Sequence, residues 1–256
     1  MSPAAERKAI PRPPANRIGS PPPWAGLSAD QRRQISLDRV RSVLVGSRTD
    51  DAARAGAWEP WRVAEADSQR QRAAAVLVPL FEEDGETRVI LTVRSDQLRS
   101  HQGEVAFPGG RLDGDEEVVH GALREAHEEV GIEPHAVTVI GELTTMPTVS
   151  SNTVMTPVVG ALGGRPTVTA NPAEVERVFD VALSDLVADG VFHEEWWLVP
   201  ERNAALGIPV GEFPVWFFEV ADETVWGATA RCLTQLLCLV LGVALPPSLG
   251  KAPPTR

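Results

Sequence analysis

The sequence predicts an α/β fold, and two kinds of segment indicate it. Residues 73–81 (AAAVLVPLF) form an apolar run typical of a buried strand, and residues 88–94 (RVILTVR) follow a short turn, which predicts a β-hairpin. Residues 116–130 carry apolar side chains at three- and four-residue steps, a period typical of an amphipathic helix. A chain of 256 residues that is 43% hydrophobic suits one globular domain with extensions.

The other elements of the domain follow in order along the chain. Further strands are predicted at residues 137–145, 154–159, 177–181, 191–199 and 215–220. A short helix is expected to start at Ser184, and residues 224–243 are predicted to form a closing helix with an apolar side made by Leu233, Leu236, Leu237 and Val240. Asp115 is the expected N-cap of the helix at 116–130, and Gly131 is expected to end it.

The N-terminal residues are predicted to lie outside this domain. Residues 1–26 are rich in proline and are expected to form a disordered or extended tail. Residues 27–72 are predicted to be a helical extension, in which Ser28 caps the helix and Gln31 completes a capping box. The globular domain then spans residues 73–246, and residues 247–256 are expected to be a flexible tail.

Charge and cysteine content narrow the classes of partner. The net charge of −11 and the pI near 5.0 argue against nucleic acid and against an anionic membrane surface. Cys232 and Cys238 are six residues apart in a helical stretch, so they should face different ways and stay reduced, as in the cytoplasm. The apolar closing helix and the N-terminal arm would bury either a homodimer contact or the core of one chain.

Three glutamates crowd one face of the helix at 116–130. Glu125, Glu128 and Glu129 stand at positions i, i+3 and i+4, and the last two lie in the final turn, where the helix dipole is already negative. Each such mismatch costs about 0.3–1 kcal/mol at an exposed site. Arg124 could compensate, and a divalent cation such as magnesium suits these oxygens better. A solvated acidic face is the alternative.

This helix belongs to a longer pattern of fixed residues. The pattern resembles the Nudix box, and its defined positions are Gly110, Glu116, Arg124, Glu125, Ala126, Glu128, Glu129, Gly131 and Ile132. The resemblance implies an α/β/α sandwich with a mixed sheet that binds Mg²⁺ or Mn²⁺ and hydrolyses nucleoside diphosphates linked to another group. It also implies that Glu125, Glu128 and Glu129 are metal ligands, that Arg124 braces them, and that Glu129 or Glu125 orients or deprotonates water.

The segment just before the box carries a second resemblance. Residues 91–110 are similar to the signature of the coenzyme A pyrophosphatase branch of the Nudix family, with Asp96 in place of the usual small residue. The resemblance implies cleavage of coenzyme A into 3′,5′-ADP and 4′-phosphopantetheine. The residues expected to hold substrate phosphates, or to let the backbone approach them, are Arg94, Arg99, Gly103, Gly109 and Gly110.

The sequence leaves the roles of three residues open, and it leaves two rival functions open as well. Glu174 and Glu142 are candidates for a further acid from a later loop, and either could equally be an ordinary surface residue. His101 lies in the basic segment, where it could be a surface histidine or could contact the substrate. The first rival is a Nudix hydrolase of another diphosphate, such as ADP-ribose or an oxidised nucleotide. The second is a Nudix module that binds a nucleotide without cleaving it.

Overall fold

The computed structural model describes residues 10–46, 72–98, 100–148, 153–199, 211–220 and 222–246. The predictions for residues 1–9, for most of 47–72, for Arg99 and for 247–256 therefore lie outside the described residues. The described strands are β1 (Asn16–Ile18), β2 (Arg72–Glu83), β3 (Glu86–Arg94), β4 (Val105–Ala106), β5 (Gly109–Arg111), β6 (Val137–Glu142), β7 (Met146–Thr148), β8 (Thr153–Leu162), β9 (Val175–Ala182), β10 (Phe192–Val199), β11 (Gly211–Val220) and β12 (Glu223–Trp226). The described helices are α1 (Ala29–Arg32), α2 (Leu37–Gly46), α5 (Val118–Val130), the 3₁₀ turn η2 (Pro134–Ala136), α6 (Leu183–Leu186) and α7 (Gly227–Leu241).

A mixed sheet is the centre of the fold, as the sequence predicts. Its strand order is β4-β3-β2-β8-β6, and β5, β7 and β9 pair with β2, β8 and β3. β2 and β3 form the predicted antiparallel hairpin around the turn at residues 84–85, whereas β2 runs parallel to β8 from Arg72 to Leu80. The pairing of β2 is therefore parallel on one side and antiparallel on the other.

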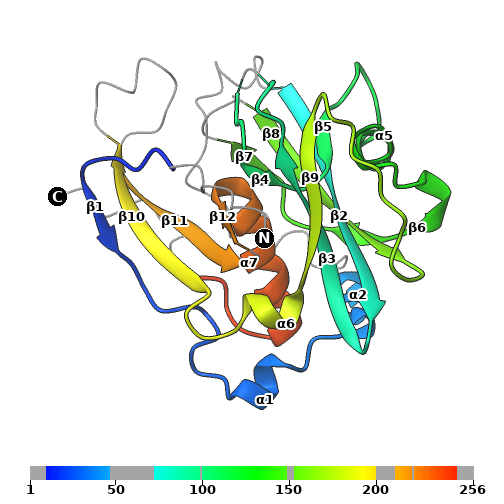
Figure 1. Ribbon diagram of the computed structural model, residues 1–256. Helices are drawn as coiled ribbons and strands as arrows, with labels where there is room; N and C mark the ends of the chain where they lie inside the picture. Colours follow the sequence, from blue (N-terminus) through cyan, green and yellow to red (C-terminus); the bar gives the residue numbers. More distant parts are fainter. Residues whose placement is uncertain are drawn as a thin grey trace, which may run out of the picture.

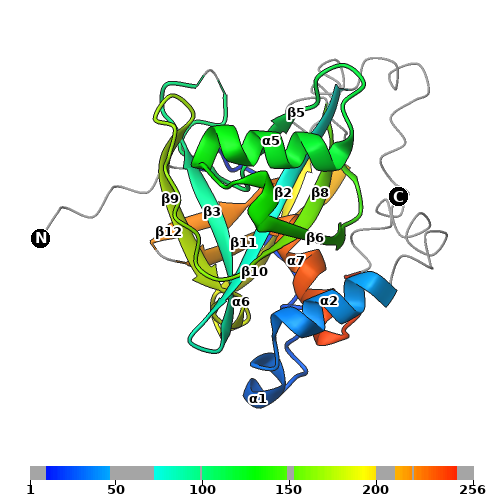
Figure 2. The same cartoon turned by 90° about the vertical axis from the view of Figure 1, so that its right-hand side faces the viewer.

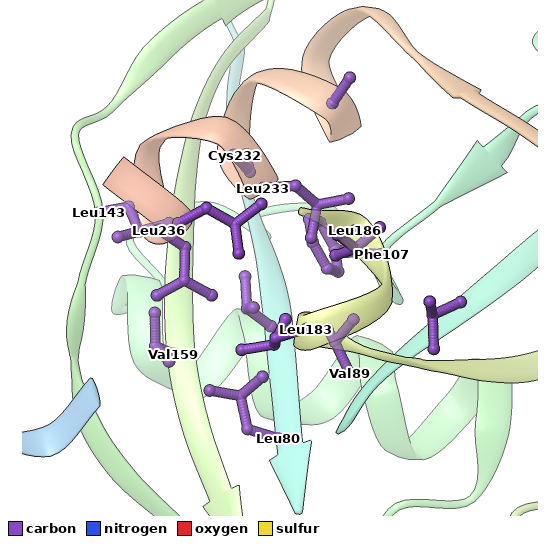
Figure 3. Close-up of a cluster of buried hydrophobic side chains, with 14 of the residues drawn as sticks. Leu80, Val89, Phe107, Leu143, Val159, Leu183, Leu186, Cys232, Leu233 and Leu236 are labelled. Carbon is purple, nitrogen blue, oxygen red and sulfur yellow. The ribbon is translucent and has the colours of Figure 1, made fainter. Parts of the chain in front are cut away.

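Helices cover both faces of this sheet and make the predicted α/β/α sandwich (Figure 2). Because successive strand residues point to opposite faces, β2 contributes to two cores. Its residues Ala75, Leu77 and Phe81 pack in the cluster that includes the apolar side of α5. Val76, Val78 and Leu80 belong to the other cluster, which includes α7. Figure 3 shows Leu80 and Val159 of the sheet facing Leu233 and Leu236 of that helix.

The last strands form a second sheet, which the sequence did not separate from the first. Its order is β1-β10-β11-β12, and α7 lies between it and the mixed sheet (Figure 1). Phe192, Trp216 and Phe218 point from this sheet into the same core as α7. The apolar side of the closing helix is thus buried within the single chain, so that side is not available for a homodimer contact.

Residues 16–26, which the sequence predicts to be part of a disordered or extended tail, lie against the domain in the structure. β1 pairs antiparallel with β10, and Trp24 is fully buried with its ring 5.3 Å from that of Phe192. The buried Glu194 carboxylate accepts hydrogen bonds from the Ser20 amide at 3.0 Å and from Trp216 Nε1 at 2.8 Å. Burial of one large aromatic ring, the pairing of β1 with β10 and the Ser20 hydrogen bond hold the segment on the domain, although its composition is that of a tail.

Three predicted helix boundaries also need correction. Helix α5 begins at Val118 with Glu117 as N-cap, because Asp113–Glu116 form a turn in which Glu116 is bonded to the Asp113 amide. The N-terminal helix keeps its Ser28 capping box but is split, since Ser36 accepts a hydrogen bond from the Arg39 amide and starts α2. The closing helix starts at Gly227, because the preceding residues pair with β11 as β12.

Two further expectations concern the cysteines and the membrane. Cys232 and Cys238 are both buried and unbridged, as predicted. Within the described residues, every helix is too short or too polar to cross a bilayer.

Replacement of Trp24 by alanine should destabilise the protein by about 3–5 kcal/mol, because it leaves a large cavity in the core. Urea unfolding followed by circular dichroism measures this loss. Ile18→Ala is the matched control in the same segment, since that side chain is 89% exposed, and it should change stability by less than about 0.5 kcal/mol. Equal stability of the Trp24→Ala variant and the wild type would show that the segment is a dispensable tail.

Candidate active site

The packing of α5 decides which way its acidic residues face. Ala122, Ala126 and Val130 are buried against the mixed sheet, as the apolar period predicts. Gly131 ends the helix in the left-handed conformation with φ 70°. Glu125 and Glu129, one position before Ala126 and Val130, are thereby turned toward β5, the short strand that contains Gly109 and Gly110.

Glu129 is the most deeply buried charged group of the site, with 3% of the residue exposed. Its Oε2 accepts a hydrogen bond from the Gly109 amide at 3.0 Å, and Arg94 Nη1 lies 4.0 Å from Oε1. Burial raises the pKa of Glu129 to about 7, although Gly109 and Arg94 act in the opposite direction. The carboxylate is therefore held in place without a counter-charge strong enough to offset its desolvation.

Glu125 lies directly against Gly110. A Cβ atom at Gly110 would be 2.5 Å from the carboxyl carbon of Glu125, so only glycine fits at this position while the glutamate stays where it is. Burial raises the pKa of Glu125, and the nearby charges of Glu128 and Glu174 act in the same direction. A second carboxylate with an elevated pKa thus lies on the same face of α5 as Glu129.

Arg124 connects the acidic residues of the helix, as the sequence predicts. Its Nε and Nη2 each donate to Glu116 at 2.9 Å, and its Nη1 donates to Glu125 at 3.0 Å and to Glu128 at 3.3 Å. The guanidinium lowers the pKa of Glu116 to about 2. Arg124 therefore ties the loop before α5 to the carboxylates on the helix.

The three predicted metal ligands, Glu125, Glu128 and Glu129, are neighbours on α5, but their side chains do not form a complete metal-binding site. Glu128 is more exposed than its neighbours, with 54% of its side chain accessible. Among the residues that the structure describes, no three acidic, histidine or cysteine side chains converge closely enough to hold an ion. The donor set still fits magnesium or manganese, because Glu125, Glu128 and Glu129 offer the hard oxygens that these ions prefer.

Arg94 is the predicted phosphate ligand that the structure brings to this site. It ends β3, its Nη1 faces Glu129, and its Nε is buried with no hydrogen-bond partner in the described part of the chain. Gly103 has φ 64° and donates its amide to the Arg94 carbonyl at 2.9 Å. Because glycine adopts a positive φ at little cost, the turn favours glycine at this position. Arg99, the other arginine of the prediction, lies outside the described residues.

The two candidates for a further acid are placed differently. Glu174 precedes β9, its carbonyl accepts from the Ser95 amide at 2.8 Å, and its charge raises the pKa of both Glu125 and Glu129. Glu142 ends β6, a strand at the opposite edge of the sheet order from β4 and β3. The structure thus brings Glu174, and not Glu142, to the acidic group of α5.

Glu104 is a residue of this region that the sequence analysis missed. Its Oε2 lies 2.9 Å from Nδ1 of His101, and its carbonyl accepts the Arg94 amide at 3.0 Å. The three-residue spacing of a histidine and an acid is a signal that could have pointed to this pair. The fold and this arrangement define a class of protein: an α/β/α sandwich in which an acidic helix faces a glycine-rich strand and an arginine.

Comparisons with known proteins agree with this class. A model of the NUDIX domain family matches residues 70–199, so the chain belongs to that family. The chain is similar to the uncharacterized Nudix hydrolase NudL of Photorhabdus laumondii, with 38% identity over 170 residues that cover 66% of this chain and 85% of that protein. It is also 38% identical to Nudix hydrolase 3 of Caenorhabditis elegans over 187 residues, which cover 68% and 75% of the two chains.

A solved structure completes the comparison. The MutT/nudix family protein from Enterococcus faecalis aligns with 83% of this chain and 77% of its own, with a TM-score of 0.42 and 14% sequence identity.

Glu129→Gln should stabilise the metal-free protein at pH 8 by about 3 kcal/mol. The pKa of this carboxyl is about 7 when folded and about 4.5 when unfolded, so its contribution to stability is fully present below pH 4.5 and is lost as the pH rises through 7. Glutamine can still accept from the Gly109 amide, and it carries no charge at any pH.

Thermal unfolding in the presence of a chelator, at pH 4.5 and pH 8, measures this difference. The melting temperature of the variant should exceed that of the wild type by several degrees at pH 8, and the gap should close at pH 4.5. A variant that is less stable than the wild type at pH 8 would show that the charge of Glu129 is well compensated in the fold.

Proposed function

We propose that this protein hydrolyses the diphosphate bond of coenzyme A or its derivatives. The observation that carries the proposal is the contact between Arg94, which is expected to hold substrate phosphates, and Glu129 of the acidic helix α5. Arg94 Nη1 lies 4.0 Å from Glu129, and the Gly109 amide donates to the same carboxylate. The buried Nε of Arg94, which has no hydrogen-bond partner among the described residues, is suited to a phosphate oxygen, since guanidinium groups bind phosphates through several N–H donors.

The metal would be Mg²⁺ or Mn²⁺, held by Glu125, Glu128 and Glu129. A bound divalent cation would neutralise charge on the diphosphate and make the attacking water more acidic. The chain supplies and positions the oxygen donors for it. Arg124 stays anchored by its two hydrogen bonds to Glu116, so it can brace the helix whichever partner Glu125 takes.

The reaction would be attack of water on one phosphorus of the diphosphate. The water oxygen forms a new bond to that phosphorus, and the bond to the bridging oxygen breaks. The bridging oxygen leaves with the other phosphate. For coenzyme A the products are 3′,5′-ADP and 4′-phosphopantetheine, or its acyl form.

Glu129 or Glu125 would orient this water or accept its proton. Both carboxylates are suited to this task, because each offers its oxygens on the side of α5 that faces Gly109 and Gly110. Arg94 would position the phosphates, and Gly109 and Gly110 would let the backbone approach them. Glu174 would add negative charge near the same carboxylates.

The test is incubation of the full-length protein with coenzyme A and Mg²⁺, with the products identified by mass spectrometry. We expect 3′,5′-ADP and phosphopantetheine from the wild type. The rate should fall at least 100-fold in Glu128→Gln and Glu129→Gln, because each variant removes an oxygen donor or the base. Glu142→Gln is the matched control, since Glu142 lies on β6, and it should retain wild-type activity.

Two other outcomes would contradict the proposal in different ways. Cleavage of ADP-ribose or an oxidised nucleotide, without cleavage of coenzyme A, would keep the acidic helix as the catalytic element and overturn the substrate. Nucleotide binding without turnover of any diphosphate would identify a binding module instead.

A further inference from the structure

A short turn beside Arg94 holds a histidine in an unfavourable backbone conformation. His101 has φ 56°, in the left-handed region that residues other than glycine seldom adopt. Such conformations persist where the surrounding structure enforces them, and they gather at functional sites.

Glu104 fixes the position of the His101 ring. Nδ1 of the imidazole lies 2.9 Å from Oε2 of the glutamate, and the His101 carbonyl accepts the Glu104 amide at 3.3 Å. The carboxylate raises the pKa of His101, which favours the cationic form. About a third of the histidine side chain is exposed, so a ligand in solution can reach this imidazole.

The turn is fastened to the backbone of Arg94. The Gly103 amide donates to the Arg94 carbonyl at 2.9 Å, and the Arg94 amide donates to the Glu104 carbonyl at 3.0 Å. The charge of Arg94 lowers the pKa of His101, but by less than Glu104 raises it. Arg94 thus contacts Glu129 through its guanidinium and carries the His101–Glu104 turn on its backbone. The same arginine therefore connects the acidic helix with the turn that contains the histidine.

We propose that His101 binds a phosphate monoester of the substrate, at a distance from the diphosphate that is cleaved. The inference rests on the proposed function, in which the diphosphate lies at Glu129 and Arg94. A histidine on the turn that is bonded to the Arg94 backbone suits a third phosphate, and coenzyme A carries such a group on its ribose. Glu104 is the positioning residue, because it holds the imidazole in one orientation and favours its charge.

The experiment compares coenzyme A with dephospho-coenzyme A, which differs only by this phosphate. In the wild type, kcat/KM should be higher for coenzyme A. His101→Asn removes the cation and keeps a residue that tolerates positive φ. The ratio of the two kcat/KM values should fall roughly tenfold in this variant, mainly through KM for coenzyme A, since a charge-assisted hydrogen bond is lost.

Two further variants make the comparison specific. Glu104→Gln should lower the same ratio, again through KM rather than kcat, because the ring loses its orientation and charge. His135→Asn is the control, since His135 is an exposed histidine on η2, and its ratio should equal that of the wild type. An equal loss for both substrates in His101→Asn would show that the histidine only braces the turn and would overturn the proposal, as would no loss at all.

A binding measurement separates this inference from the proposed function. If neither coenzyme A substrate is cleaved, the proposed function fails, and calorimetry with 3′,5′-ADP and 5′-AMP still tests His101. Tighter binding of 3′,5′-ADP than of 5′-AMP by the wild type, with the difference lost in His101→Asn, would support recognition of the monoester. Equal affinities, or no binding of either nucleotide, would overturn it.

Discussion

Burial of β2 on both faces is the constraint on which the rest of the structure depends. Its side chains alternate between the core under α5 and the core around α7, so the strand fixes the positions of both helices. Its backbone also pairs with β5 at Val76 and Ala75, which places Gly109 and Gly110. The glycine strand and the acidic helix therefore meet because both are built on the same strand. Any shift of β2 by one residue would exchange its two faces and separate the site.

The acidic face of α5 is held together by two different kinds of contact. Glu116 and Glu128 are paired with Arg124 near solvent, where the guanidinium offsets their charge. Glu129 is desolvated, and its close contact is a backbone amide. The acidic group thus combines two carboxylates that share an arginine with a buried carboxylate whose pKa is raised by desolvation. Glu128 and Glu129 differ in burial because α5 packs on the sheet with only one of its sides. Two glutamates that are adjacent in the sequence therefore have different environments.

The sequence predicted the parts of the fold that have a periodic pattern. The hairpin of β2 and β3, the apolar side of α5 and the Gly131 end of that helix could all be predicted, because each depends on local spacing or on a single residue type. The grouping of Glu125, Glu128 and Glu129 followed from helix geometry in the same way. The docking of Trp24 could not be predicted, since one buried ring in a proline-rich stretch leaves no periodic signal. The hydrogen bond between the Gly109 amide and Glu129 could not be predicted either, because it depends on the register of β5 on β2.

The attachment of the N-terminal segment to the second sheet has a consequence for folding in the cell. Trp24 is made early, but its partners Phe192 and Phe218 come 168 and 194 residues later in the chain. At a typical rate of synthesis this interval lasts about 10–40 s, and domains whose contacts are distant in sequence also fold slowly. During that time the indole and the edge of β1 have no native partner and are exposed to other chains. The ribosome-bound protein is therefore expected to need a chaperone until β11 emerges, and its native core can close only when α7 is complete.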